Sequence, residues 1–362
     1  MSPQPSPSEV PLVSVIVPAR NEEASLGVCL RSLVAQSGVS HEIIVVDDAS
    51  TDGTRAIAAG IPGVRVIGAD PLPPGCSGKC NAAQTGANAA RGEWLLFTDA
   101  DTFHEPGSLA NAIAEAKQHR AALLSYSPRQ EVRGFWERAV MPVVFAELAA
   151  AYSPAEICDP ASTAAAANGQ FLLIRRDVYQ AIGGHAAFGH TLLEDVVLAR
   201  AVKQRGHRLR FRYSDSVRSR MYRSFGQMRE GWTKNLALLF PETPALAGKR
   251  ALEFVVIAGG LAAFVIGLTA GEKDLAVVSL GIAALVWLRF LRRIRRAHFG
   301  STENLLAITG LPVFVYLLLR SRLSYQRRKQ VAWKGRMYSV AQAAAPTAGE
   351  VGIPACSKAV QH

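Results

Sequence analysis

The sequence predicts an α/β domain followed by apolar helices in a membrane. Over residues 11–245, apolar runs of strand length alternate with helical patterns, an order typical of a parallel sheet with right-handed crossovers. Several of these runs end in aspartates, at the edge of the sheet where open α/β folds bind ligands. Beyond residue 250 the composition changes to apolar runs, the first of which is long enough to cross a bilayer. These three observations predict a ligand-binding α/β domain with a C-terminal membrane anchor.

The composition narrows the partners of this chain. Its 40 Lys and Arg against 29 Asp and Glu give a net charge of +11, which suits either nucleic acid or an anionic membrane surface. The basic residues concentrate in 289–296 and 320–336, beside apolar runs and without the interleaved aromatic residues that stack nucleic-acid bases. The charge therefore favours a membrane and argues against nucleic acid.

The chain begins with a segment that we expect to be disordered. Residues 1–10 are rich in Ser and Pro and lack the basic start and apolar centre of a signal peptide. Residues 12–18 then form an apolar run typical of a buried strand. Residues 21–23, Asn-Glu-Glu, follow with a capping residue and an acidic first turn, which predict a helix.

The same strand-loop-helix pattern repeats twice more. Residues 42–48 predict a strand that ends in two acids, and a helix is expected over 54–59. A short third strand is expected over 64–67. The loop 68–78 is rich in Pro and Gly, and the Ala-rich residues 79–91 resume a helical pattern.

A strand over 93–98 leads into the most informative acids of the chain. Asp99 and Asp101 follow it, and in extended backbone side chains two residues apart share a face. Two close carboxylates need a cation or a shared proton, and hard oxygen ligands suit Mg²⁺ or Mn²⁺. The pattern therefore predicts a metal that holds a diphosphate. A solvated turn is the alternative, because Asp is common where strands become loops.

The second half of the domain carries weaker patterns. The apolar stretch 135–152 is interrupted by charges, so it predicts a core helix or an interfacial helix, and we prefer the interface. A further strand is expected over 169–174. Helices are expected from 192–199 and over 224–239.

Three apolar segments define a membrane region over 251–320. Residues 251–270 are long enough to span a bilayer, and a second run covers 275–288. The arginines that follow it should stay cytoplasmic, which places the α/β domain in the cytoplasm and the protein in the cell inner membrane as a multi-pass protein. The third run, 305–319, is short and split by Gly310 and Pro312. We expect it to be re-entrant or interfacial, because a third span would put the basic residues of the tail 321–362 outside. Residues 340–362, at the end of that tail, are expected to be disordered.

Three side chains are candidates for nucleotide and phosphate binding. Asp47 and Asp48 end the second strand, where a carboxylate can accept hydrogen bonds from a base or a ribose. Capping of the next helix is an equal alternative for either of them. Lys79 follows a Gly-rich loop at a helix N-terminus, where it can meet a phosphate, although a solvated lysine has the same pattern.

A candidate general base lies at the start of a later helix. Asp195 can deprotonate an acceptor hydroxyl while a metal stabilises the leaving diphosphate. Glu194 beside it leaves the choice of residue open. The alternative for either is a first-turn acid favoured by the helix dipole.

The acidic motifs together resemble the family 2 glycosyltransferases with the GT-A fold. Four motifs occur in the order of that family, at residues 13–23, 45–54, 99–101 and 194–195. The resemblance implies a Rossmann-like domain and an inverting, metal-dependent transfer from a nucleotide-sugar, usually a UDP-sugar such as UDP-glucose. It also implies roles for residues of the nucleotide site (Pro18, Ala19, Glu22 and Asp48), for ligands of metal and diphosphate (Asp99 and Asp101) and for the base (Asp195).

A narrower resemblance is to membrane-bound carotenoid-acid and hopanoid-associated glycosyltransferases. It rests on residues 73–80, the three apolar segments and 333–336, Trp-Lys-Gly-Arg. Processive relatives carry Gln-x-x-Arg-Trp, whereas here Gln227, Arg229 and Trp232 have other spacings, which argues against processive synthesis. We expect Arg229, Trp232 and Glu194 on the acceptor side, with helix packing as an equal alternative for the first two.

The sequence therefore predicts a membrane-anchored enzyme that moves a sugar to a lipid or isoprenoid acceptor. One alternative keeps the fold and changes the acceptor to a polyprenyl phosphate or an exopolysaccharide precursor. Another is an inactive sugar-nucleotide sensor, against which the complete set of acidic motifs argues.

Overall fold

The structure is a computed structural model that describes residues 10–328 and 330–339. The expected disorder of residues 1–9 and 340–362 lies outside the described residues. The chain divides into two compact units. The sheet unit comprises, of the described residues, 10–131, 152–221 and 334–339, and the helical unit comprises 132–151 and 222–333 without residue 329. Each unit is described by itself.

The sheet unit is built on an eight-stranded mixed sheet with the order β3-β2-β1-β4-β7-β6-β8-β5. The strands are β1 (Val13–Ala19), β2 (His41–Asp47), β3 (Val64–Gly68), β4 (Trp94–Phe97), β5 (Thr102–His104), β6 (Leu123–Gln130), β7 (Leu172–Arg175) and β8 (Leu209–Ser219). The strands expected over 12–18, 42–48, 64–67, 93–98 and 169–174 are confirmed as β1, β2, β3, β4 and β7, with shifted ends.

The expected parallel pairing holds for β3, β2, β1 and β4 and for the pair β6–β8, and it is wrong for β7 and β5. β3, β2, β1 and β4 pair in parallel, but β7 runs antiparallel to both β4 and β6, and β5 runs antiparallel to β8. The chain enters β7 after an excursion through residues 132–151 of the helical unit. Antiparallel neighbours can be joined without a crossover helix packed on the sheet. The segment that joins β6 to β7 can therefore belong to the helical unit, because β7 runs antiparallel to β6.

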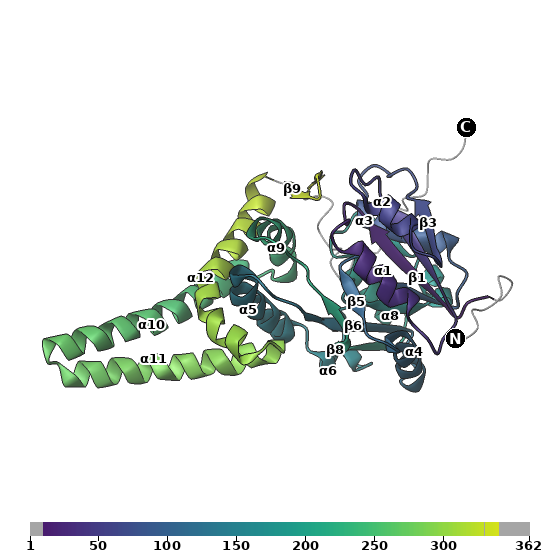
Figure 1. Cartoon of the computed structure of the whole chain (residues 1–362). Coiled ribbons are helices and arrows are strands. Elements are labelled where there is room, and N and C mark those ends of the chain that lie inside the picture. Colours follow the sequence, from purple (N-terminus) through teal and green to yellow (C-terminus); the bar gives the residue numbers. More distant parts are fainter. Residues whose placement is uncertain (1–9, 329, 340–362) are drawn as a thin grey trace. The chain divides into compact units, whose positions relative to one another are not determined.

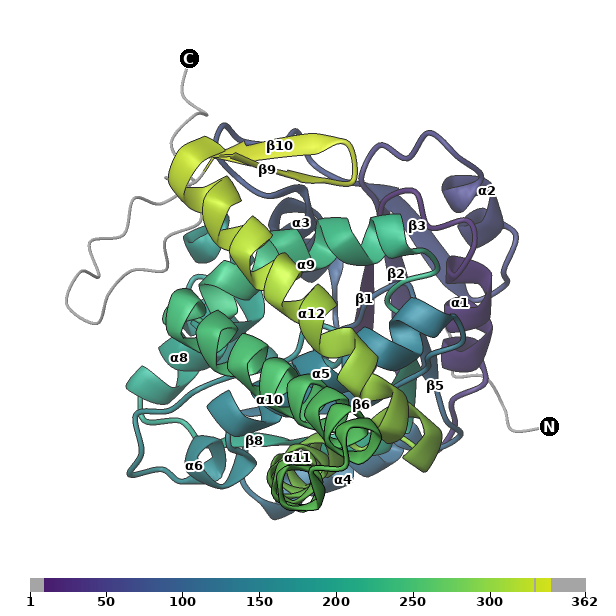
Figure 2. The same cartoon turned by 90° about the vertical axis from the view of Figure 1, so that its left-hand side faces the viewer.

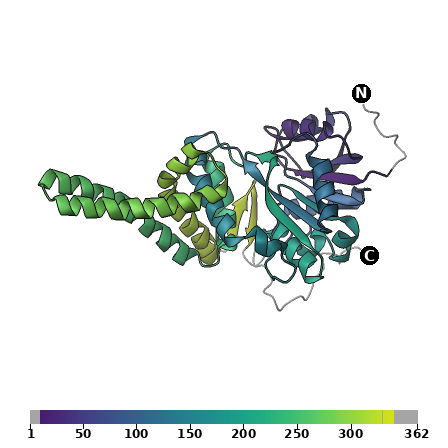
Figure 3. The same cartoon turned by 90° about the horizontal axis from the view of Figure 1, so that it is seen from below.

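Helices cover both faces of the sheet (Figure 1, Figure 3). One core packs Val15 and Val17 of β1 against Leu30, and the other packs Ile16 against Ala83 and Leu198. Since β1 is buried on both faces, it reads as a continuous apolar run. The helices are α1 (Leu26–Val34), α2 (Thr54–Ala59), α3 (Gly78–Ala89), α4 (Ser108–Gln118), α6 (Pro154–Cys158), α7 (Arg176–Ala181) and α8 (Glu194–Gln204), with a 3₁₀ turn η1 (His185–Phe188).

The helical unit contains three helices that are long and apolar enough to cross a membrane, at residues 243–270, 273–297 and 301–327. Its elements are α5 (Phe135–Ala151), α9 (Phe225–Leu239), α10 (Thr243–Ala270), α11 (Lys273–Ile294), η2 (Arg295–Ala297), α12 (Ser301–Leu323), η3 (Ser324–Arg328) and β9 (Gln330–Trp333). α10 and α11 lie side by side as a hairpin, which Figure 2 shows nearly end-on. Large apolar side chains on this hairpin, such as Leu252 and Val277, are 64% and 71% exposed, as a lipid-facing surface requires.

The third apolar segment is one continuous helix. We expected an interruption at Gly310 and Pro312, but both lie inside α12. Gly310 is buried against α5, where an added Cβ would lie 2.0 Å from the carbonyl oxygen of Ala139. This glycine therefore permits close helix packing and does not end the helix. The membrane topology of α12 stays a prediction.

Helix α5 is largely a core element of the helical unit. Val140, Val143 and Val144 are fully buried, while Phe135 at its start is 52% exposed. This burial favours the core-helix alternative for the stretch 135–152. α5 is also tied to the hairpin by charge, because Glu147 lies 3.0 Å from Arg250 and 3.1 Å from Arg293. Removing one partner of this cluster would leave a buried charge without its counter-ion.

Replacing Gly310 by Ala is expected to destabilise the helical unit by about 1–3 kcal/mol, since the new methyl group meets backbone atoms that cannot move aside. Thermal unfolding of the full chain in detergent measures the change. Gly281→Ala on α11 is the matched control, because an added Cβ there meets nothing within 4 Å. It should leave the melting temperature unchanged or raise it, as Ala favours helix over Gly. Equal melting temperatures for the two variants would contradict the packing argument.

Candidate functional site

The candidate site lies where β1, β2 and β4 end at one edge of the sheet. Because these strands are parallel, their carboxyl ends meet. Asn21 and Ala49, in the loops after β1 and β2, both adopt left-handed backbone conformations, with φ 52° at each. The Asn21 Oδ1 atom accepts a hydrogen bond of 2.9 Å from the Thr51 amide, so the two loops hold each other.

Asp99 and Asp101 stand at this edge, directly after β4. The Asp101 Oδ1 atom is buried and has no hydrogen-bond partner among the described residues. Burial, then the charges of Asp99 and Glu22, raise the pKa of Asp101 to about 7. A buried, unpartnered carboxylate oxygen beside a second carboxylate is the environment that a divalent cation stabilises. No group of three or more His, Cys, Asp or Glu suited to a metal occurs in the described part of the chain.

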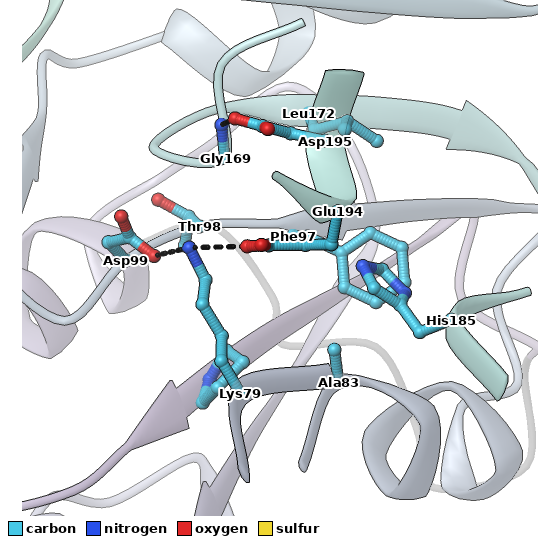
Figure 4. Close-up of a pocket in the computed structure, with 11 residues that line it drawn as sticks. Lys79, Ala83, Phe97, Thr98, Asp99, Gly169, Leu172, His185, Glu194 and Asp195 are labelled. Atoms are coloured by element: carbon cyan, nitrogen blue, oxygen red, sulfur yellow. Dashed lines mark hydrogen bonds and ion pairs between the residues drawn. The ribbon is translucent and has the colours of Figure 1, made fainter. Parts of the chain in front are cut away.

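Lys79 joins two parts of the site. Its Nζ atom lies 2.9 Å from Asp99 Oδ1 and 3.0 Å from Glu194 Oε1, so it bridges the strand and the start of α8 (Figure 4). Ser77 caps α3 just before it, accepting a 3.1 Å hydrogen bond from the Cys80 amide. Burial alone would lower the pKa of Lys79, but Asp99 and Glu194 raise it well above its ordinary value. Lys79 is therefore a permanent cation in the pocket.

Asp195 is held by backbone groups. Its Oδ2 atom accepts a 2.9 Å hydrogen bond from the Gly169 amide (Figure 4). Its Oδ1 atom accepts one of 2.8 Å from the Val196 amide. Burial, then Glu194, raise the pKa of Asp195 to about 6, against the lowering effect of Lys79. Because Lys79 pairs with Glu194 and not with Asp195, the two neighbouring acids are distinguishable. With its raised pKa, the Asp195 carboxylate can accept a proton near neutral pH.

Sequence reasoning missed two further residues of this pocket. An added Cβ at Gly169 would lie 2.9 Å from Lys79 Nζ, so glycine leaves room for the ion pair. His185, in η1, lines the pocket and shares a 2.9 Å hydrogen bond with the Tyr179 hydroxyl. Burial lowers the pKa of His185 to about 4, so the imidazole is neutral. The sequence around each of these two residues resembles that of an ordinary loop, so no local pattern identified them.

The two aspartates that end the second strand have different environments. Asp47 accepts a 3.3 Å hydrogen bond from the Ser50 amide and lies 3.6 Å from Arg55, so it stabilises the turn before α2 and does not cap that helix, whose N-cap residue is Gly53. Asp48 is only 7% exposed and pairs with both terminal nitrogens of Arg336, at 2.9 Å for Nη2. Ala19 accepts a 2.9 Å hydrogen bond from the Asp48 amide.

Pro18 and Glu22 complete the predicted nucleotide side. Pro18, near the end of β1, lines the same pocket as Lys79 and Asp195. The Glu22 carboxylate accepts hydrogen bonds from Ser25 Oγ, at 3.0 Å, and from Lys334 Nζ. Lys334 and Arg336 were not among the predicted site residues, because no local pattern connects them with an edge of the sheet some 290 to 310 positions earlier in the chain.

The two other residues expected on the acceptor side belong to the helical unit. Trp232 is 2% exposed and packs against Tyr222 and Phe145, with ring centroids 5.8 and 6.3 Å apart. This burial favours the packing alternative for Trp232. Arg229, on the same helix α9, is exposed. Its place on the acceptor side stays a prediction.

Comparison with known proteins finds a matching family model and relatives that span most of the chain. Residues 14–183 match the model of glycosyl transferase family 2. The 4,4'-diaponeurosporenoate glycosyltransferase of Staphylococcus aureus strain MRSA252 is 27% identical over 343 residues, which are 91% of this chain and 89% of that protein; its counterpart in strain USA300 gives the same figures. Among solved structures, a mannosyltransferase from Pyrobaculum calidifontis, in complex with GDP-Man and Mn²⁺, has a TM-score of 0.52 at 20% identity, covering 90% of each chain. This likeness confirms the fold that the sequence motifs predict.

Proposed function

We propose that this chain is a family 2 glycosyltransferase and that it transfers a sugar from a nucleotide-sugar to a lipid or isoprenoid acceptor at a membrane. The proposed donor is UDP-glucose or a similar nucleotide-sugar. The proposed acceptor is of the carotenoid-acid type, which the name of the Staphylococcus aureus relatives and the three apolar helices support.

The donor site is proposed at the edge where β1, β2 and β4 end. Asp48 would accept hydrogen bonds from the base or ribose, beside Pro18, Ala19 and Glu22. Lys79 would bind the diphosphate, since its ammonium group is fixed at the N-terminus of α3 and stays charged. The position of Asp48 at the carboxyl end of β2 supports the placement of the base and ribose at Asp48 and of the diphosphate at Lys79.

A divalent cation, Mg²⁺ or Mn²⁺, is the proposed cofactor. Asp99 and Asp101 would hold it, and the buried, unpartnered Oδ1 atom of Asp101 fits this role. When bound, the cation would neutralise the charge that develops on the leaving diphosphate. Lys79 would add a second positive charge on the same side.

Asp195 is the proposed general base. The amides of Gly169 and Val196 fix its carboxylate, and a pKa of about 6 keeps most of it ionised at neutral pH. With a hydroxyl acceptor it would take the proton as the oxygen attacks the anomeric carbon from the face opposite the diphosphate, whereas an ionised carboxylate acceptor would attack without giving up a proton. This single displacement inverts the configuration and forms no covalent bond with the enzyme.

The membrane would present the acceptor. We propose a multi-pass protein of the cell inner membrane with the catalytic domain in the cytoplasm, where nucleotide-sugars are available. The hydropathy of the three long helices and the arginines after α11 support this topology. Lipid-linked acceptors then need only diffuse in the plane of the membrane.

One observation carries the proposal: Lys79 pairs with both Asp99 and Glu194, and these three residues line one pocket together with Asp195, the proposed base. The test is sugar transfer and nucleotide release by the full chain in membranes, with UDP-glucose, GDP-mannose and other donors, Mn²⁺ and a lipid extract. Metal-dependent release that an Asp99→Ala/Asp101→Ala double variant abolishes is the expected result. Nucleotide binding without release, with every donor and acceptor, would overturn catalysis and support the sensor alternative.

A further inference from the structure

The C-terminal residues Lys334 to Arg336 reach the donor site of the sheet unit. Arg336 forms a bidentate ion pair with the Asp48 carboxylate, and Lys334 Nζ donates a hydrogen bond to the Glu22 carboxylate. Lys334 also donates a 3.3 Å hydrogen bond to the Arg20 carbonyl, and Arg20 Nε returns one of 3.3 Å to the Lys334 carbonyl. We call Lys334, Gly335 and Arg336 the basic strap.

The local structure is adapted to this contact. An added Cβ at Gly78 would lie 1.8 Å from Arg336 Nη1 and 2.4 Å from Asp48 Oδ2, so a side chain at residue 78 would exclude the ion pair. Lys334 and Gly335 both have positive φ, 45° and 77°, the backbone of a tight turn that glycine favours. A lysine held in this conformation points to a functional constraint on the turn.

The basic strap places Lys334 and Arg336 beside acidic side chains that the donor and the divalent metal would use. Asp48 is the proposed ligand of the base or ribose, and Asp101 a proposed metal ligand. Lys334 is near enough to Asp101 to lower its pKa, against the larger effects of burial, Asp99 and Glu22. A nucleoside that takes Asp48 frees the Arg336 guanidinium, and a metal at Asp101 repels Lys334. The anion then available to both cations is the donor diphosphate.

We propose that the basic strap is part of the donor site: Lys334 and Arg336 neutralise Asp48 and Glu22 in the free protein and bind the diphosphate once the nucleotide has displaced them. This inference rests on the proposed function. The strap has no bond-making role, so Lys334 and Arg336 are binding and positioning residues. Arg336 suits a diphosphate because its planar guanidinium can donate two parallel hydrogen bonds to phosphate oxygens.

The test compares two ligands that differ only in phosphate. Binding of UDP and of uridine to the full chain in detergent with Mn²⁺ is measured by calorimetry, for wild type and for Arg336→Gln; GDP and guanosine replace them if wild type prefers GDP. We expect Arg336→Gln to bind UDP at least about tenfold more weakly, because a charge-assisted hydrogen bond is lost. Uridine should bind more tightly, because Asp48 no longer has to release Arg336.

Controls separate this pattern from misfolding. Arg205→Gln, at an exposed arginine of the sheet unit, should bind both ligands as wild type does, and Arg336→Lys should recover part of the UDP affinity. Tighter binding of both ligands to Arg336→Gln would show that Arg336 only blocks the site, and this result would overturn the inference. Unchanged binding of both ligands would overturn it as well. If wild type binds neither UDP nor GDP, the proposed function fails together with the inference. Weaker binding of both ligands alongside a lowered melting temperature would count against it as well.

Discussion

An Asp101→Asn variant should lose about a thousandfold in kcat/KM for sugar transfer, yet be more stable than the wild type in the metal-free state at pH 8. The loss follows because the amide removes a charged ligand of the proposed cation, whose neutralisation of the diphosphate is worth several kcal/mol in the transition state. The isosteric side chain keeps the shape of the site. A substitution that lowers activity but raises stability indicates that the charge serves function. Replacing a residue needed for folding would lower both.

The sign of the stability change follows from the pKa of Asp101. The folded protein raises this pKa from 3.8 to about 7, so the folded state binds the proton more tightly than the unfolded chain does. The wild type therefore loses stability as pH rises from about 3.8 to about 7, and the loss is complete above that range. Asn at 101 has no such loss, so its advantage should be absent at pH 3.5 and full at pH 8.

Thermal unfolding of the full chain in detergent with a chelator, at several pH values, measures this advantage. Asp274→Asn, at an exposed acid of the helical unit, is the control and should change neither activity nor the pH dependence. Added Mn²⁺ should reverse the order and stabilise the wild type more than the variant. An Asp101→Asn variant that keeps wild-type turnover with saturating donor would remove Asp101 from the metal site.

The second large effect is expected at Asp195. With an acceptor that carries a hydroxyl group, Asp195→Asn should lower kcat by a factor of about 10² to 10⁴, the usual contribution of a general base. The wild-type rate should rise with pH through about 6, as the carboxylate loses its proton, and the variant should lack this limb of the profile. Glu194→Gln is the comparison variant: it should keep this limb of the profile but move it to lower pH, because the Glu194 charge raises the pKa of Asp195.

The same variant identifies the chemistry of the acceptor. A carotenoid acid or a polyprenyl phosphate is already ionised at neutral pH, so its oxygen needs no base, and Asp195→Asn should keep most of its activity with such an acceptor. Parallel assays with a hydroxyl acceptor and an acid acceptor separate the two cases. An equal loss with both acceptors would mean that Asp195 acts by positioning the substrate and not by accepting a proton.

Local patterns in the sequence determined much of the sheet unit. The alternation of apolar strands and capped helices predicted β1, α2, β2, β3 and α3, because burial on two faces and helix starts each leave a short-range pattern in the chain. The places of Asp99, Asp101 and Asp195 in the fold were predictable for the same reason, and their roles stay predictions. Each lies at the end of a strand or the start of a helix, positions that sequence periodicity reveals.

Contacts between distant segments were decided by the tertiary structure alone. The antiparallel direction of β7, the burial of Trp232 and the role of Gly310 in packing α12 against α5 have no local pattern, because each depends on what a remote segment offers as a neighbour. Asp47 and Asp48 look alike in the sequence, yet one holds a turn and the other faces Arg336, 288 positions away. The raised pKa of Asp101 likewise comes from desolvation and from the charges of Asp99 and Glu22, and burial and the approach of Glu22 exist only in the folded chain.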